Sequence, residues 1–191
     1  MATRSKLTQK ELKTRLRAVK MLLFDVDGVL TDGRIIWGES GEYKAFDAKD
    51  GLALALAKRA GFKTGIITAK SSKAVEVRAA EMKMDVVYQN SFEKLVPYQE
   101  VLESFGLADH EVCYMGDDLF DLVVLNRVGL AVAPADAAPE VRESVHLVTR
   151  SLGGRGAVRE LVETLLKAQD KWDPLLRELG WVSSDMKEKN S

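Results

Sequence analysis

Cysteine, histidine and proline are scarce in this chain of 191 residues, which contains one Cys, two His and four Pro. A lone Cys113 excludes a disulfide within the chain. One cysteine and two histidines also supply fewer than the four ligands of a structural Cys/His zinc site. We therefore expect Cys113 to be a buried strand residue, His110 and His146 to be surface residues without a chemical role, and any bound metal to be held by carboxylates.

Long apolar runs and an excess of charge of one sign are missing as well. No apolar run approaches the roughly 20 residues of a membrane-spanning helix, and the N-terminus has no apolar segment of the signal-peptide kind. The 28 basic residues nearly cancel the 29 acidic ones. No bulk charge favours a nucleic-acid or membrane partner. We expect a cytoplasmic protein that binds any anion through a local site.

The hydrophobic content of 46% is enough for one sizeable core, and the length predicts a single domain over residues 1–191. Short apolar runs alternate with helical segments along most of the chain. This alternation predicts an α/β fold, in which helices cover both faces of a parallel sheet and ligands bind beyond the carboxyl ends of the strands. The predicted strands are 21–24, 63–68, 85–88, 112–115 and 130–132, and helices are predicted at 51–60, 72–83, 92–105, 119–128 and 139–144.

Three further segments flank or interrupt this alternation. Thr8 and Glu11 have the spacing of a capping box at the start of a short N-terminal helix. Residues 34–46 have the pattern of a small β-hairpin, with its turn at Gly38 to Gly41. A glycine-rich segment at 153–156 leads into a last helix at 157–168, and the charged tail 169–191 ends in a polar stretch, 183–191, that we expect to be disordered.

Polar side chains follow several of the predicted strands. Asp25, Asp27, Thr68 and Asp117 lie at strand ends, and Lys94 lies near the start of the helix after the third strand. Carboxylates gathered at one sheet edge repel each other unless a hard cation such as Mg²⁺ compensates them. An ammonium and a hydroxyl beside such a cation suit a phosphoryl group, whose oxygens need donors. The sequence therefore predicts a magnesium-dependent phosphoryl-transfer site.

Three other aspartates, Asp32, Asp118 and Asp121, lie close to these positions in the sequence. They are equally compatible with ordinary turn or helix-cap residues and with a supporting role behind the metal ligands. The residues alone leave both possibilities open.

The motifs themselves resemble those of the haloacid dehalogenase (HAD) superfamily. The segment Phe24 to Gly33, FDVDGVLTDG, resembles the first motif, and Gly116 to Asp121, GDDLFD, resembles the fourth. Thr68 and Lys94 match the second and third motifs in order and spacing. The resemblance implies a Rossmann-like HAD core with a small hairpin insertion.

For the chemistry, the resemblance implies a phosphatase with a covalent intermediate. Asp25 would attack phosphorus to form an aspartyl-phosphate, and Asp27 would protonate the leaving alcohol and then activate water. Thr68 and Lys94 would hold phosphoryl oxygens. The expected ligands and neighbours of Mg²⁺ are Asp25, the main-chain carbonyl of Asp27, Asp117 and, behind them, Asp118 or Asp121.

Most HAD phosphatases carry a cap domain, for which this chain has no room, so closure of the site must come from neighbouring subunits. Capless chains with this hairpin, a Lys-Asp-Gly element and a terminal GGRGAVRE resemble the 3-deoxy-D-manno-octulosonate 8-phosphate (KDO 8-phosphate) phosphatase family. The resemblance implies a role in lipopolysaccharide precursor biosynthesis. It also implies a homotetramer assembled through the hairpins, in which Gly153 to Gly156 of one subunit closes the site of the next.

The same resemblance implies a set of substrate-binding residues. The family often has Ile-Thr-Gly-Arg where this chain has Ile-Thr-Ala-Lys, so Lys70 replaces a planar guanidinium. Two alternatives stand beside this reading: a phosphatase for a nine-carbon keto-deoxy sugar 9-phosphate, and a non-catalytic HAD assembly module, against which the retained acidic residues and lysine argue. The expected substrate-binding residues are Lys49, Asp50, Gly51, Lys70, Arg78 and Arg155.

Overall fold

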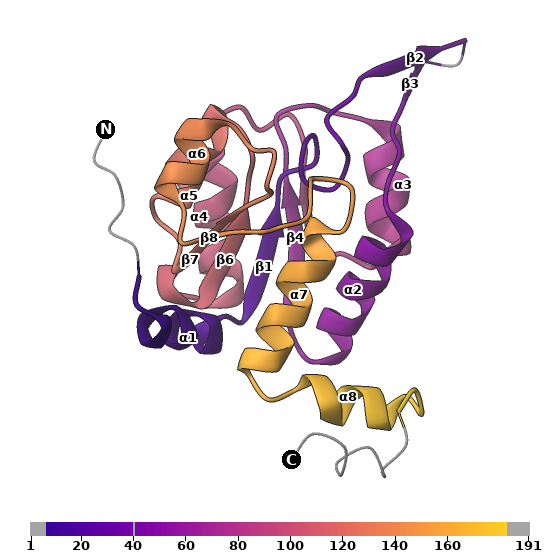
Figure 1. The fold of residues 1–191 in the computed structure, drawn as a ribbon. Coiled ribbons are helices and arrows are strands. Elements are labelled where there is room, and N and C mark those ends of the chain that lie inside the picture. Colours follow the sequence, from indigo (N-terminus) through magenta and orange to yellow (C-terminus); the bar gives the residue numbers. More distant parts are fainter. Residues whose placement is uncertain (1–6, 40, 183–191) are drawn as a thin grey trace.

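The computed structural model describes residues 7–39 and 41–182, and a six-stranded parallel sheet forms the centre of the molecule (Figure 1). The strands lie in the order β5-β4-β1-β6-β7-β8, and each pairs in parallel with its neighbours. The predicted α/β class with a parallel sheet is thus confirmed. The strands are β1 (Met21–Phe24), β4 (Lys63–Ile67), β5 (Val86–Tyr88), β6 (Val112–Met115), β7 (Leu130–Ala133) and β8 (Leu147–Val148).

Helices cover both faces of this sheet, and each face has its own hydrophobic core. Alternate residues of β1 point to opposite faces, as strand geometry requires: Leu22 and Phe24 join one cluster of buried residues, whereas Met21 and Leu23 join the other. The first cluster includes residues of α1, α2, α3 and α7, and the second includes residues of α4, α5 and α6. The helices are α1 (Gln9–Ala18), α2 (Ala48–Arg59), α3 (Lys73–Glu81), α4 (Leu95–Phe105), α5 (Leu122–Leu125), α6 (Pro139–Ser144), α7 (Ala157–Ala168) and α8 (Trp172–Glu178), with short 3₁₀ turns at Asp109–Glu111 and Leu119–Asp121.

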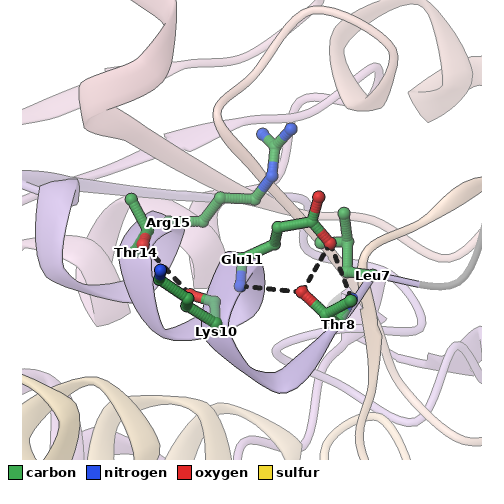
Figure 2. Close-up of a pocket in the computed structure, with 6 residues that line it drawn as sticks. All are labelled: Leu7, Thr8, Lys10, Glu11, Thr14 and Arg15. Atoms are coloured by element: carbon green, nitrogen blue, oxygen red, sulfur yellow. Dashed lines mark hydrogen bonds between the residues drawn. The ribbon is translucent and has the colours of Figure 1, made fainter.

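Helix α1 begins with the predicted capping box, which Figure 2 shows in close-up. The Thr8 hydroxyl accepts a hydrogen bond from the Glu11 main-chain N–H at 3.2 Å, and the Glu11 carboxylate accepts one from the Thr8 N–H at 2.7 Å. Figure 1 places α1 at the end of the sheet where β1 begins. The pocket whose lining residues Figure 2 draws therefore lies at the opposite end of β1 from the residues that follow this strand.

A two-stranded hairpin projects from the body of the molecule beyond the carboxyl end of the sheet (Figure 1). Its strands are β2 (Ile36–Gly38) and β3 (Gly41–Tyr43), which pair antiparallel. Both faces of the hairpin expose large apolar side chains, and Trp37 is 73% exposed. Such a surface is unusual for a hairpin that contacts only water. The exposed apolar residues are Ile35, Ile36, Trp37 and Tyr43.

The structure differs from the sequence-based expectations in three places. The helix predicted at 119–128 is a 3₁₀ turn followed by the short helix α5. The edge strand β8 was not predicted, and the tail contains α8, which packs Leu175 into the core. The disorder predicted for 183–191 lies outside the described residues. No helix in the described ranges is long and apolar enough to cross a membrane.

Candidate active site

The site is built where β1 and β6 end side by side. Phe24, the last residue of β1, pairs with Met115, the last of β6, so Asp25 and Asp117 leave the sheet at the same edge. With Asp121 they offer carboxylate oxygens that all lie within 4.8 Å of one another. Gly28 has a positive φ of 86°, and a Cβ at this position would clash with the Asp117 carboxylate. The glycine of the first motif therefore leaves space for the aspartate of the fourth.

Lys94, just before α4, places its ammonium between two of these carboxylates. Its Nζ lies 2.7 Å from Asp121 Oδ1 and 3.1 Å from Asp25 Oδ1, and its side chain is only 1% exposed. Burial opposes the charge, but the Asp121 and Asp25 carboxylates outweigh burial and raise the pKa of Lys94 above its ordinary value. Lys94 therefore stays a cation beside Asp25.

Asp121 lies behind this pair and is fully engaged. Its Oδ1 also accepts a hydrogen bond from the Tyr114 hydroxyl at 2.6 Å, and its Oδ2 accepts from the main-chain N–H groups of Asp117 at 2.9 Å and Asp118 at 3.2 Å. Asp121 thus fixes both Lys94 and the loop that carries Asp117. The sequence reasoning missed Tyr114, although a tyrosine inside a buried strand was a usable signal, since its hydroxyl needs a partner.

The Asp25 and Asp117 carboxylates lie in a less favourable environment than Asp121. Burial, reinforced by the charge of Asp121, raises the pKa of Asp25 to about 6 and that of Asp117 to about 8. Within the described chain, Asp25 Oδ1 and Asp117 Oδ1 are buried without a hydrogen-bond donor in suitable geometry, although Lys94 lies beside Asp25. Two buried carboxylate oxygens without a hydrogen-bond donor in suitable geometry, close together in one cluster, fit a hard divalent cation.

Asp27 is held by Lys44, the residue that directly follows β3 of the hairpin. Lys44 Nζ lies 2.5 Å from Asp27 Oδ1 and 2.7 Å from Glu42 Oε1. The Thr31 hydroxyl is a more distant neighbour, 3.4 Å from the same Asp27 oxygen. The sequence reasoning missed both Lys44 and Glu42. Their spacing of two residues, which places both on one side of an extended segment, was the available signal.

The remaining motif residues occupy varied positions. Thr68 is buried at the end of β4, next to β1, and its N–H donates to the Tyr88 carbonyl at 2.9 Å. Asp118 is exposed and accepts a hydrogen bond from the Leu119 N–H at 2.7 Å, which makes it a helix-cap residue. Asp32 accepts a hydrogen bond from the Arg34 N–H, as a turn residue does. Of the two possibilities left open for these aspartates, the structure gives Asp118 and Asp32 capping or turn contacts and Asp121 contacts inside the site.

The glycine-rich segment packs against the first-motif loop of its own chain. The Gly154 N–H donates to the Val29 carbonyl at 2.8 Å, and a Cβ on Gly153 would clash with the Gly28 carbonyl. Asp50, buried in α2, accepts hydrogen bonds from the N–H groups of Gly156 at 3.2 Å and Arg159 at 2.7 Å, where α7 begins. Asp50 therefore connects the Lys-Asp-Gly element to the glycine-rich segment.

The other expected substrate-binding residues divide into engaged and exposed side chains. Arg78 donates to the Asp47 carbonyl at 3.4 Å and pairs with Glu81 at 3.2 Å, and a Cβ on Gly51 would clash with its guanidinium. Arg155 is 55% exposed and lies 3.4 Å from Asp32. The side chains of Lys49 and Lys70 are exposed. The structure thus gives Asp50 and Arg78 partners within the chain and leaves the two lysines open to solvent.

An α/β sheet that ends in an Asp-x-Asp segment, with a buried lysine and a second acidic segment beside it, defines the class of haloacid dehalogenase-like hydrolases. The family model of that description matches residues 64–161, and the chain belongs to this family. Among its relatives, the 3-deoxy-D-manno-octulosonate 8-phosphate phosphatase KdsC of Escherichia coli strain K12 is 44% identical over 156 residues, which are 81% of this chain and 83% of the relative.

Solved structures show the same similarity. A crystal structure of 3-deoxy-D-manno-octulosonate 8-phosphate phosphatase from Yersinia pestis has a TM-score of 0.84 at 41% identity, and the match covers 85% of this chain and 89% of that chain. The enzyme of the same name from Moraxella catarrhalis, solved with magnesium, phosphate and KDO, has a TM-score of 0.87 at 34% identity and covers 90% and 99%. The likeness thus extends over most of this chain and of both enzymes.

Proposed function

We propose that this protein hydrolyses KDO 8-phosphate to KDO and inorganic phosphate, as a step of lipopolysaccharide precursor biosynthesis. The observation that carries the proposal is the cluster of Asp25, Asp117, Asp121 and Lys94, in which Asp25 Oδ1 and Asp117 Oδ1 are buried without a hydrogen-bond donor in suitable geometry. The identity of 44% to a KDO 8-phosphate phosphatase over most of both chains supports this particular substrate.

In the first step, Asp25 attacks phosphorus, and the bond from phosphorus to the sugar oxygen breaks as Asp27 gives that oxygen a proton. In the second step, Asp27 takes a proton from water, the water oxygen attacks phosphorus, and the bond to Asp25 breaks to release phosphate. Lys94, which is a cation 3.1 Å from Asp25, would hold a phosphoryl oxygen together with Thr68. The enzyme returns to its starting state after each turnover.

Mg²⁺ is the cofactor that this donor set fits. The Asp25 and Asp117 carboxylates and the main-chain carbonyl of Asp27 would hold the ion, while Asp121 keeps the loop in place through its contacts with two main-chain N–H groups. When bound, Mg²⁺ neutralises negative charge on the phosphoryl oxygens.

We propose that exposed cationic side chains bind the sugar end of the substrate. Arg155, Lys49 and Lys70 carry positive charge that can pair with the sugar carboxylate. The roles expected for Asp50, Gly51 and Arg78 stay predictions, and the contacts of Asp50 and Arg78 within the chain favour an indirect effect, through the placement of α2 and α7.

We also propose a homotetramer assembled through the hairpins. The exposed apolar side chains of β2 and β3 support it, because they would be buried between copies of the chain. The closure of a neighbour's site by Gly153 to Gly156 stays a prediction, and it must be compatible with the packing of this segment on its own chain. The cytoplasmic location likewise stays a prediction.

The substrate is tested with a panel of phosphorylated sugars. We expect a preference in kcat/KM of at least about tenfold for KDO 8-phosphate over the nine-carbon 9-phosphate, and more over neutral hexose phosphates, because each well-placed contact contributes about 1–3 kcal/mol. Phosphate release is measured with Mg²⁺ and with a chelator. A reversed order of the two keto-deoxy sugars would identify the nine-carbon alternative, and no release from any sugar would favour a non-catalytic assembly module.

The assembly is tested at Trp37. Replacing Trp37 with Glu should convert the oligomer to smaller species, because a charge at a buried interface lacks a partner. Sedimentation velocity measures the change, and Glu39→Gln at the exposed hairpin turn is the matched control that should leave the oligomer intact. A wild-type protein that is active and strictly monomeric would overturn the proposed tetramer.

A further inference from the structure

Lys44, which follows the hairpin strands, places its charged group beside Asp27, the second aspartate of the first motif. It follows β3 directly, and its side chain is only 1% exposed. The ammonium lies 2.5 Å from Asp27 Oδ1 and 2.7 Å from Glu42 Oε1. The hairpin is thus tied to the residue two positions beyond Asp25.

This contact is strong enough to hold a side chain in place. Burial opposes the charge of Lys44, but the hydrogen bonds that its ammonium donates to the Asp27 and Glu42 carboxylates outweigh burial and raise its pKa, so Lys44 stays an ammonium. Charge-assisted hydrogen bonds are about twice as strong as neutral ones. The other neighbour of Asp27 Oδ1 is the Thr31 hydroxyl, at the longer distance of 3.4 Å. Lys44 therefore determines where Asp27 Oδ1 lies.

We propose that Lys44 is a positioning residue that occupies Asp27 Oδ1 and leaves Oδ2 as the oxygen that exchanges protons with the substrate. This inference rests on the proposed function, in which Asp27 is the acid/base group. In the first step Oδ2 gives its proton to the leaving oxygen, and in the second Oδ2 takes a proton from water, so no net proton is gained or lost. Glu42 Oε1 lies 2.7 Å from the same ammonium and places a second negative charge beside it.

A purely structural role for Lys44 makes a different prediction. If Lys44 only fastened the hairpin, its loss would impair all substrates alike. If it positions the acid, its loss should matter most when the leaving oxygen needs a proton. A sugar alkoxide is a poor leaving group that needs protonation, whereas 4-nitrophenolate leaves readily without it. The two substrates therefore distinguish the two roles.

The experiment compares Lys44→Met with Arg34→Met, an exposed hairpin-base residue that serves as the matched control. The quantity is kcat/KM, which reports events up to phosphorylation of Asp25, for KDO 8-phosphate and 4-nitrophenyl phosphate. For Lys44→Met we expect a loss on the order of 10- to 100-fold with the sugar phosphate and less than about threefold with the aryl phosphate. Arg34→Met should leave both values near those of the wild type.

Equal losses on both substrates, or no loss on either, would overturn the positioning role. If Lys44→Met does not fold, as judged by circular dichroism and sedimentation, Glu42→Gln is used instead, because it loosens the same ammonium. We expect Glu42→Gln to lower kcat/KM more for the sugar phosphate than for the aryl phosphate, by smaller factors than Lys44→Met. Equal losses on the two substrates in Glu42→Gln would also overturn the positioning role. If the wild type cleaves 4-nitrophenyl phosphate but not KDO 8-phosphate, the proposed substrate fails. The best alkyl phosphate of the panel then replaces it, and the test of Lys44 stands.

Discussion

Replacing Asp25 with asparagine is expected to abolish phosphate release, with a loss of more than about 10³-fold in kcat. An amide cannot form the phosphoenzyme bond, and Asp121 cannot replace the nucleophile because it accepts from Lys94, Tyr114 and two main-chain N–H groups. Release of inorganic phosphate from KDO 8-phosphate with saturating Mg²⁺ measures the effect. Retention of more than a few per cent of activity would remove Asp25 as the nucleophile.

The same substitution should not weaken the fold. Burial and the charge of Asp121 raise the pKa of Asp25 to about 6, so the ionised carboxylate is unfavourable in the metal-free protein at pH 7.5. Lys94 keeps its partner Asp121 at 2.7 Å. In a chelator, we therefore expect the Tm of Asp25→Asn to equal or exceed that of the wild type.

Asp85 provides the opposite control. It lies at the other edge of the sheet, where Lys58 at 2.7 Å and the Thr64 N–H at 2.9 Å hold its pKa below the ordinary value despite burial. Asp85→Asn should lower Tm and leave kcat nearly unchanged. A fall in Tm in Asp25→Asn as large as that in Asp85→Asn would mean that the Asp25 carboxylate stabilises the fold instead of destabilising it.

Much of the fold followed from the pattern of strands and helices. The apolar run Met21 to Phe24 has the pattern of a buried parallel strand, and the rule that parallel strands end at one edge predicts Asp25 beside Asp117, as the pairing of β1 with β6 confirms. The short edge strand β8 and helix α8 were not predicted, because two residues carry no periodicity and α8 is stabilised by the packing of Leu175 on the core.

The site could be predicted only as far as the motifs extend. Lys44 was missed because its contact with Asp27 depends on the path by which the chain returns from the hairpin to the sheet, which hydrophobic periodicity does not encode. Asp50 and Arg78 were expected to bind substrate, yet their observed partners are the start of α7 and the Asp47 carbonyl. Helix α7 itself buries six residues in the core, so the glycine-rich segment is anchored by a helix on which the whole fold depends.

Stability without metal should fall as pH rises, and Mg²⁺ should reverse the loss. The pKa values of Asp25 and Asp117 are about 6 and 8 in the folded chain, because of burial first and neighbouring carboxylates second, against an ordinary 3.8. Between the ordinary pKa of 3.8 and the raised values of about 6 and 8, the folded state therefore binds more protons than the unfolded state. The stabilisation from these two groups is complete below about pH 4 and is lost as pH rises through 6 and 8.

Mg²⁺ and protons compete for the same carboxylates, so the stabilisation by Mg²⁺ should grow with pH. At 100-fold excess over its Kd the ion adds about 2.7 kcal/mol to the free energy of unfolding, and less at pH 5, where protons weaken its binding. Thermal unfolding with Mg²⁺ and with a chelator at pH 5, 6.5 and 8 measures the difference. Asp117→Asn removes one ligand and the more strongly shifted carboxyl, so it should diminish both the Mg²⁺ increment and the pH slope. An Mg²⁺ increment that is equal at all three pH values, or that survives in Asp117→Asn, would place the ion away from this cluster.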